Sequence, residues 1–342
     1  MTQYPVPSSP SWSTLVKSLF LLVYFVKIFF AGTQLQTLPL GHRFPMSKYE
    51  LLKTRVSQEM AFMDLIESKP ATEGELALVH SPSYIDQVFS GTLPSTVQKA
   101  IGFPWSLGMV DRARCSTGAT IQAARQALKE GISANLAGGT HHAYADQGGG
   151  FCVFNDVAVA TRLLQVEHHR TSAEPFNVAI VDLDVHQGNG SARIFREDET
   201  VFTLSLHGAK NFPFEKECSD LDVELPDGTQ DAAYLSALAQ ALRTMTSRFK
   251  PNFVFYLAGA DPYKGDRLGR LSLSMDGLRS RDEAVFLWAR EQGLPLAFVM
   301  AGGYGHDMQE TAQIQMNTFA SAYATWLLWQ SQRFSHEANS SF

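Results

Sequence analysis

The chain has 342 residues, of which 45% are hydrophobic and 18% charged, and its formal net charge is −6. A chain this long and apolar can bury a large core, which excludes a mostly disordered protein. The mild acidity argues against a protein that grips nucleic acid through a basic face. The three cysteines, Cys115, Cys152 and Cys218, form no C-x-x-C pair. This pattern indicates a reducing compartment and neither a disulfide framework nor a thiolate zinc site.

A short apolar run stands near the N-terminus. Residues 19–26 (LFLLVYFV) are continuously apolar, and residues 28–31 (IFFA) follow Lys27. A membrane-spanning helix needs roughly 20 apolar residues, far more than this run supplies. We therefore expect a leader at residues 1–26 and a first buried strand at 28–31. A signal peptide ending at Ala31–Gly32 and a membrane anchor stay open, although cleavage there would remove part of the sheet.

Helices and short strands alternate along the first half of the chain. Helices are predicted at residues 48–67, 83–89, 109–130 and 157–166, with Gly131 as the C-cap of the third. Short strands are predicted at residues 74–79 and 134–136.

Four nearly continuous apolar runs give the strongest strand signals, at residues 177–183, 201–206, 253–258 and 296–300. Helices are predicted between and after them at residues 191–196, 232–249, 275–292 and 311–330, before a frayed, disordered tail at 332–342. Buried strands that alternate with helices predict an α/β fold with a parallel sheet covered on both faces.

Polar or glycine-rich loops follow these strands: GGTHHAY, DVHQGNG, HGAKNFPF, GADPYKGD and GGYGHD. The ligand site of a parallel sheet lies beyond the carboxyl ends of its strands. Five such loops at one edge would build one site. Because they come from residues 138–306, we predict a single domain at residues 27–331.

The segment DLDVH, residues 182–186, carries the most chemical information. Residues two apart at a strand end project to the same side, so Asp184 and His186 can share one ion. A catalytic zinc needs three such protein ligands plus water. Asp182 can orient a histidine from behind. On these residues alone, a purely structural interpretation stays open, in which the segment is a polar strand end and Asp184 caps a helix.

A third ligand is predicted at Asp261, because a carboxylate behind the apolar run FVFYLAGA is costly unless it meets a cation. Asp266 is the competing residue. It lies farther into a glycine-containing loop, where we expect a solvated or turn position.

His141, His142 and Tyr304 are the candidate catalytic groups. The adjacent histidines follow Gly138–Gly139 and suit general acid–base work beside a metal-bound water, with a second metal site as the weaker interpretation. Tyr304 stands between glycines, where a phenol can stabilise a developing oxyanion. The alternative for Tyr304 is a turn residue packed on the surface.

Together these strings resemble the zinc-dependent histone deacetylases of the arginase–deacetylase superfamily. The matching strings are GGTHHAY, GGGFCVFNDVAVA, VDLDVHQGNGSA, LAGADPYKGDRLGRL and AGGY. GHRFPMSKYELL and NFPFEKECSDLDVELPDGTQD are most similar to the class IV branch and its bacterial relatives. The resemblance covers residues 27–328.

The resemblance implies an α/β domain around an eight-stranded parallel sheet, with zinc on Asp184, His186 and Asp261. It also implies catalytic roles. His142 is the general base and His141 its electrostatic partner, Asp182 pairs with His141, and Tyr304 polarises the amide carbonyl. Asn189 replaces an aspartate of some branches, so it orients His142 without adding a negative charge.

The resemblance implies two further sites. The walls of an acyl-lysine tunnel would be Gly150, Phe151 and Phe212, with Phe214 as the alternative to Phe212. A potassium ion would lie among the backbone carbonyls of Asp182, Asp184, His186, Ser205 and Leu206.

The implied reaction is zinc-dependent hydrolysis of the amide of acyl-lysine in a protein or peptide. An acetylpolyamine or another acetylated small amine is the alternative substrate. A binuclear manganese ureohydrolase is disfavoured because Gly188 stands where a further aspartate would extend the D-x-H pattern. A catalytically dead binding module is disfavoured because all three ligands and Tyr304 are present. We expect no direct nucleic acid binding and a cytoplasmic location, or a nuclear one in a eukaryote. Membrane contact through residues 14–31 stays open.

Overall fold

Parallel strands form the centre of the fold. They are β1 (Val26–Phe30), β2 (Met63–Glu67), β3 (Ile132–Asn135), β4 (Val178–Asp182), β5 (Val201–Gly208), β6 (Leu221–Leu225), β7 (Phe253–Leu257) and β8 (Leu296–Val299). They pair in one sheet in the order β2-β1-β3-β8-β7-β4-β5-β6. This computed structural model describes residues 26–32, 38–39 and 41–339. The predicted eight-stranded parallel sheet is confirmed.

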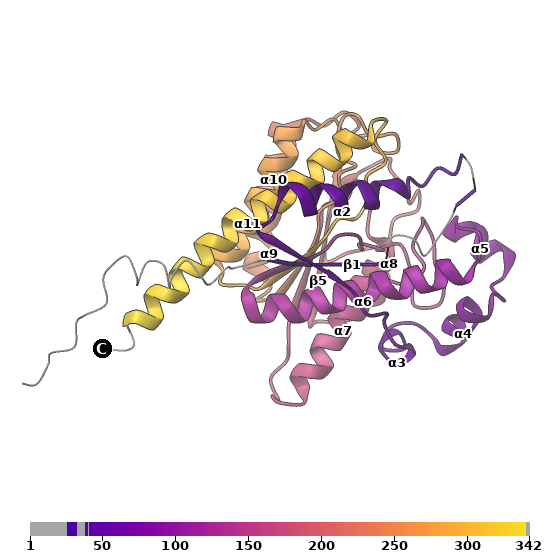
Figure 1. The fold of residues 1–342 in the computed structure, drawn as a ribbon, viewed down its shortest axis with the longest axis horizontal. Coiled ribbons are helices and arrows are strands. Elements are labelled where there is room, and N and C mark those ends of the chain that lie inside the picture. The colour runs from indigo at the N-terminus through magenta and orange to yellow at the C-terminus, as the bar shows by residue number, and fades with distance from the viewer. Residues whose placement is uncertain (1–25, 33–37, 40, 340–342) are drawn as a thin grey trace, which may run out of the picture.

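Helices cover both faces of this sheet. They are α2 (Ser47–Glu59), α3 (Glu73–Leu76), α4 (Pro82–Ser90), α5 (Ser95–Ile101), α6 (Leu107–Glu130), α7 (Asp156–His169), α8 (Asn189–Phe195), α9 (Asp231–Arg248), α10 (Met275–Glu291) and α11 (Met308–Asn339). One hydrophobic cluster joins a sheet face to α2, α9, α10 and α11, and a second joins the opposite face to α4, α6 and α7. Figure 1 shows α2, α10 and α11 on one side of the strands and α6 and α7 on the other.

Strand β7 explains why apolar runs mark the central strands. All five of its residues are fully buried. Val254 and Tyr256 belong to the first cluster, whereas Phe253, Phe255 and Leu257 belong to the second. A strand covered on both faces has no place for alternating polar residues. The four apolar runs therefore appear close to their predicted bounds, as β4, β5, β7 and β8.

Two predicted elements are wrong. The helix predicted at residues 48–67 ends at Glu59, and residues 63–67 form the edge strand β2. The ladder of β2 with β1 overrides the local helix propensity of this segment. The strand predicted at 74–79 is instead the short helix α3, which starts at a capping box of Thr72 and Glu75.

Helix α5 and strand β6 have no counterpart among the predicted elements. The helix predicted to end near residue 330 continues to Asn339 as α11, across most of the segment predicted as a tail. Residues 331–339 contain neither Gly nor Pro, so nothing in this segment stops the helix.

The N-terminal leader lies outside the described residues, apart from Val26, which opens β1. The strand predicted at residues 28–31 is present as β1, one to two residues earlier in the chain. Its Ile28 and Phe29 pair with β3. Within the described segments, no helix is both long and apolar enough to cross a membrane.

Candidate active site

The carboxyl ends of β4 and β7 bring three metal-ligating side chains together. Asp184 and His186 follow β4, and Asp261 follows β7, its neighbour in the sheet. One ligand atom from each lies within 4.8 Å of the other two, and all three side chains are buried. His186 Nδ1 is 2.9 Å from Asp184 Oδ1 and 3.3 Å from Asp261 Oδ2. The competitor Asp266 is not in this cluster.

The two buried carboxylates of this cluster carry more negative charge than its one imidazole can neutralise, which favours a bound cation. Burial and the neighbouring Asp184 carboxylate raise the pKa of Asp261 to about 7. Against the effect of burial, the Asp184 and Asp261 carboxylates raise the pKa of His186 to about 10. Among the described residues, Asp261 Oδ2 is a buried atom that accepts no well-aligned hydrogen bond. Two buried carboxylates and one imidazole thus fit a metal ion, which would supply the positive charge they need.

Backbone N–H groups fix the two carboxylates. Asp184 Oδ2 accepts from the N–H of Gly302 at 2.7 Å, and Asp261 Oδ1 accepts from the N–H of Val185 at 2.9 Å. A Cβ atom at Gly302 would lie 1.8 Å from Asp261 Oδ2. This position therefore requires glycine, because the chain runs directly against the ligands.

His141 and His142 form a linear hydrogen-bonded chain beside the cluster. His141 Nδ1 lies 2.6 Å from Asp182 Oδ2, His141 Nε2 lies 3.2 Å from His142 Nε2, and His142 Nδ1 lies 2.6 Å from Asn189 Oδ1. Asn189 Nδ2 in turn donates to the Tyr144 hydroxyl at 2.8 Å. Because the Asn189 carbonyl accepts from Nδ1, the lone pair of neutral His142 lies on Nε2.

The two histidines have opposite charge preferences. Burial lowers the pKa of His141, but the charges of Asp182 and Asp184 outweigh it and raise this pKa to about 9. Burial, together with the charges of His141 and His186, holds the pKa of His142 well below its usual value. At neutral pH the pair therefore combines a protonated His141 with a neutral His142.

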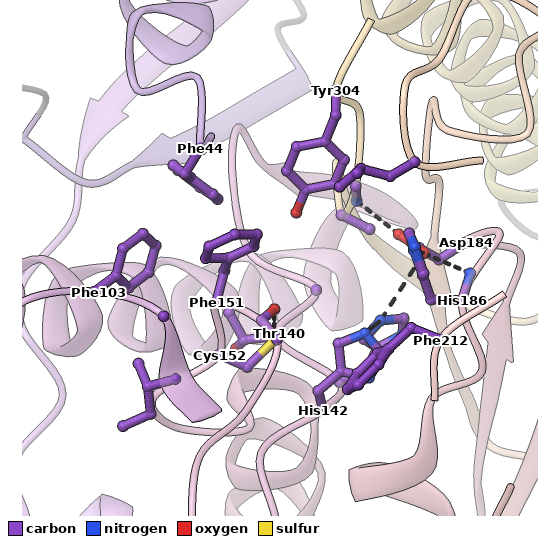
Figure 2. A pocket seen from close by; sticks show the side chains of 18 of the residues that line it. Phe44, Phe103, Thr140, His142, Phe151, Cys152, Asp184, His186, Phe212 and Tyr304 are labelled. Carbon is purple, nitrogen blue, oxygen red and sulfur yellow. Dashed lines mark hydrogen bonds and ion pairs between the residues drawn. The ribbon is translucent and has the colours of Figure 1, made fainter. Parts of the chain in front are cut away.

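Tyr304 lies on the loop after β8 and is 8% exposed. Figure 2 shows its hydroxyl pointing into the cavity between Phe151 and the Asp184–His186 pair. Burial raises the pKa of this phenol well above its usual value, so it keeps its proton. The Tyr304 N–H donates to Asp266 Oδ2 at 2.6 Å. Asp266 is thus a turn residue, as expected, and it also holds the Tyr304 backbone.

An aromatic cavity of about 640 Å³ leads to these groups. Phe212 lies against His142, with ring centroids 4.9 Å apart at 84°, and Phe151 lies 6.0 Å from the Tyr304 ring (Figure 2). Gly150 adopts a φ of 54°, and a Cβ there would meet His142 Cδ2 at 2.5 Å. Phe214 is 86% exposed, so the structure places Phe212 and not Phe214 beside the histidine.

Several supporting residues were not predicted from the sequence. Phe44 and Phe103 complete the aromatic wall, with rings 4.9 Å apart. The buried Asp156 carboxylate accepts from the N–H groups of Gly139 and Thr140, which precede the histidine pair. The D-V sequence after Asn155 gave no indication of this role, because the partners are 16 and 17 residues away.

Three of the residues expected around potassium lie on adjacent strands, whereas Asp184 and His186 lie in the loop after β4. Asp182 at the end of β4 is in register with Ser205 of β5, and Leu206 follows. All three are buried. The backbone carbonyls expected to hold potassium thus belong to two neighbouring strands, β4 and β5, and to the loop after β4.

Comparisons with known proteins agree with this arrangement. Residues 42–320 match the family model of the histone deacetylase domain. An uncharacterised protein of Picosynechococcus sp. is 43% identical over 275 residues, which cover 80% of this chain and 90% of that protein. Histone deacetylase 2 of Arabidopsis thaliana is 34% identical over 261 residues, which cover 73% of this chain and 65% of that protein.

Similarity extends to solved structures. The crystal structure of an HDAC homolog from Aquifex aeolicus superposes with a TM-score of 0.71 at 26% sequence identity, covering 87% of this chain and 84% of that one. The match to the family model spans most of the chain, and it includes every residue of the metal cluster and the histidine pair. The chain therefore belongs to the histone deacetylase family and is a hydrolase of amide bonds.

Proposed function

We propose that this protein removes acyl groups from lysine side chains of a protein or peptide, with a zinc ion held by Asp184, His186 and Asp261. One observation carries the proposal: an aromatic-walled cavity ends where His142, Tyr304 and the Asp–His–Asp cluster meet. Paired phenylalanines suit the aliphatic stem of a lysine, which is apolar along its length and polar only at the amide.

Zinc, when bound, would supply Lewis acidity that polarises the amide carbonyl and lowers the pKa of a water molecule. His142 can accept a proton from the attacking water at Nε2, because its low pKa keeps the ring neutral and the Asn189 carbonyl accepts from Nδ1. Tyr304 keeps its proton and can donate a hydrogen bond to the oxyanion.

Protonation of the leaving amine follows from the same histidine pair. His141 is protonated at neutral pH, and its Nε2 lies 3.2 Å from His142 Nε2. A proton taken up by His142 is then available to the leaving amine nitrogen. Asp182 holds His141 in the required orientation from Nδ1.

We also propose a structural potassium ion at the carbonyls of Asp182, Asp184, His186, Ser205 and Leu206.

We further propose that the protein belongs to the class IV branch and that it is located in the cytoplasm, or in the nucleus in a eukaryote. The unpaired state of Cys115, Cys152 and Cys218 supports a reducing compartment. Contact with a membrane through residues 14–31 concerns a segment that lies mostly outside the described residues.

A substrate panel tests the reaction. The purified protein is assayed on an acetyl-lysine peptide, a fatty-acyl-lysine peptide and an N-acetylpolyamine, with and without chelator, and its metal content is determined. We expect about one zinc per chain and chelator-sensitive release of acid from at least one lysine peptide. Two ions per chain would favour a binuclear ureohydrolase, and turnover of the polyamine alone would overturn the lysine assignment.

Two variants assign the reaction to this site. Tyr304→Phe and Asp184→Asn should each reduce turnover by roughly 10²-fold or more, since each removes a group that acts on the reacting atoms. Tyr323→Phe on α11 is the matched control, because Tyr323 lies outside the cavity. Wild-type turnover by Tyr304→Phe on every acyl-lysine peptide tested would reject the mechanism.

A further inference from the structure

Exposed cationic side chains line the cavity that leads to the candidate active site, and we call these five the rim: Arg43, Lys99, Lys210, Arg267 and Arg270. A sixth lining cation, Arg112, is half-buried and also borders a small second pocket beside Phe30 and Leu136. Among the described lining residues the only carboxylate is Asp184, which belongs to the metal cluster at the floor. The chain as a whole carries a net charge of −6, so this positive rim is a local feature against an acidic background.

These charges are only partly neutralised by the protein itself. Asp227 forms ion pairs with two of them, at 2.8 Å from the Arg270 guanidinium and 4.0 Å from Lys210 Nζ. Both cations remain more than half exposed, at 53% and 74% of their side chains. Asp266 lies nearby, but its oxygens accept from the backbone N–H groups of Tyr304, Leu268 and Gly269.

The other three rim cations, Arg43, Lys99 and Arg267, form no salt bridge with a carboxylate among the residues whose side chains the structure describes.

Arg267 is fixed at this rim by the catalytic loop. Its Nε donates to the Tyr304 carbonyl at 2.8 Å, and its Nη2 donates to the Arg43 carbonyl at 3.3 Å. Guanidinium groups held in place in this way recognise carboxylates with little loss of side-chain freedom.

We infer that the physiological substrate presents carboxylates beside the acylated amine, as an acyl-lysine flanked by Asp or Glu in a polypeptide. The inference rests on the proposed function and names its substrate class. The rim cations come from several separate segments of the chain, which carry Arg43, Lys99, Lys210 and the Arg267–Arg270 loop. Phe214, 86% exposed at the same mouth, offers an apolar contact to a peptide backbone or side chain.

The same rim selects against cationic substrates. An acetylpolyamine keeps free ammonium groups a few bonds from its amide, and a Lys- or Arg-rich tail places like charges against the rim. Juxtaposed like charges lower affinity and association rate, whereas opposite charges raise both. Because these groups are exposed to solvent, the preference should weaken with added salt.

Three peptides that differ only in their flanking residues test the inference. Each contains the same central acyl-lysine, flanked by Asp and Glu, by Ser and Gln, or by Lys and Arg. We expect kcat/KM to be about tenfold higher for the acidic than for the basic peptide, with the difference mainly in KM. At 0.5 M salt the difference should shrink severalfold. Free Nε-acyl-lysine is a fourth substrate. It shows whether the single α-carboxylate of an amino acid is sufficient for recognition or whether an acidic polypeptide is needed.

Rim variants provide the second half of the test. Lys99→Gln combined with Lys210→Gln should reduce the ratio of acidic to basic kcat/KM severalfold. Arg279→Gln is the matched control, because Arg279 is an exposed cation on α10 that pairs with Glu283 away from the cavity. Equal rates on all three peptides, a preference for the basic one, or an unchanged ratio in the double variant would overturn the inference.

A binding measurement separates failure of this inference from failure of the proposed function. Turnover of the neutral peptide with no dependence on flanking charge refutes the rim's role and leaves the deacylase assignment intact. If no peptide is turned over, the deacylase assignment fails. Fluorescence anisotropy of the labelled peptides can then still compare the affinities of Tyr304→Phe for the acidic and the basic peptide. Equal affinities in that experiment would refute the inference as well.

Discussion

The ammonium group of Lys48 lies over the ring of Tyr304, with Nζ 5.2 Å from the ring centroid. Lys48 is 1% exposed, and its Nζ donates to the carbonyl of Gly303 at 3.2 Å. The rings of Phe44 and Tyr49 lie 5.7 and 5.0 Å from the same nitrogen. A buried cation thus connects helix α2 to the loop that carries Tyr304.

Lys48→Met should lower kcat roughly tenfold or more with a smaller effect on KM, because it releases the Tyr304 loop without removing a group from the cavity. A charged hydrogen bond to a carbonyl is worth about 1.5–3 kcal/mol, which sets this magnitude. The measurement is steady-state kinetics together with thermal unfolding. Lys53→Met is the control, since Lys53 on the same helix packs over Phe30 and not over Tyr304. An unchanged kcat in Lys48→Met would refute the positioning role.

Asn189→Asp should move the acidic limb of the kcat/KM profile to higher pH. In the reaction that we propose, His142 accepts a proton, for which it must be neutral, and burial holds its pKa well below the usual value. A carboxylate 2.6 Å from Nδ1, in place of the Asn189 amide, favours the protonated imidazole and raises that pKa. Activity is therefore lost at a higher pH as the solution is acidified. Tyr144→Phe removes the other partner of the Asn189 amide without adding charge, and it should not produce this shift.

The sequence predicted the centre of the sheet better than its edges. Strands β4, β5, β7 and β8 are buried on both faces, so their apolar runs are unmistakable. Strands β2 and β6 lie at the two ends of the sheet order. Their residues are mostly half-buried, and segments such as LDVEL mix polar with apolar side chains. Only the ladder to a neighbouring strand determines that they are extended, and a local pattern does not contain that contact.

The residues of the Asp–His–Asp cluster could be predicted from the sequence, and Asp182 and Asn189 beside the histidine pair from the resemblance, but the more distant groups that hold the site could not. Asp184 and His186 are two residues apart, and a strand brings this spacing to one side. Lys48, in contrast, contacts the carbonyl of Gly303 across 255 positions of sequence. Phe44 also lines the aromatic cavity, and it is similarly far in sequence from the loop that carries Gly303. Such contacts arise from the packing of helices on the sheet, which short motifs do not encode.

Arg281→Met should destabilise the fold by about 3–5 kcal/mol, since it leaves a buried carboxylate without its cation. Arg281 and Asp282 are fully buried, and Arg281 Nε donates to Asp282 Oδ1 at 2.9 Å. Arg281 Nη1 also donates to the carbonyl of Gly259, which directly precedes the Asp261 loop. Denaturant unfolding measures the loss.

Arg279→Met is the matched control on the same helix. Arg279 pairs with Glu283 at 2.9 Å, but the two side chains are 61% and 44% exposed. An exposed pair of this kind contributes about 0.3–0.5 kcal/mol. Equal losses for the two variants would contradict the structural role of the buried pair.

His80 gives the fold an acid sensitivity of predictable sign. It is 1% exposed, and its Nε2 accepts from the backbone N–H of Asn155 at 3.0 Å, next to the start of α7. Burial lowers the pKa of His80 from 6.5 to about 4. Between these values the unfolded chain binds a proton that the folded protein does not. The contribution of neutral His80 to the free energy of unfolding is therefore complete above pH 6.5, and it decreases as the pH falls towards 4.

His80→Gln should remove this part of the pH dependence, because a glutamine oxygen can accept from Asn155 but does not titrate. Moving a pKa from 6.5 to about 4 corresponds to up to about 3 kcal/mol. Urea unfolding of both proteins at a series of pH values between 7 and 4 measures the difference. All other titrating groups are common to the two proteins and cancel in the comparison. The stability of wild type relative to His80→Gln should fall steadily across this range, and two parallel curves would show that His80 is protonated equally in the folded and unfolded states.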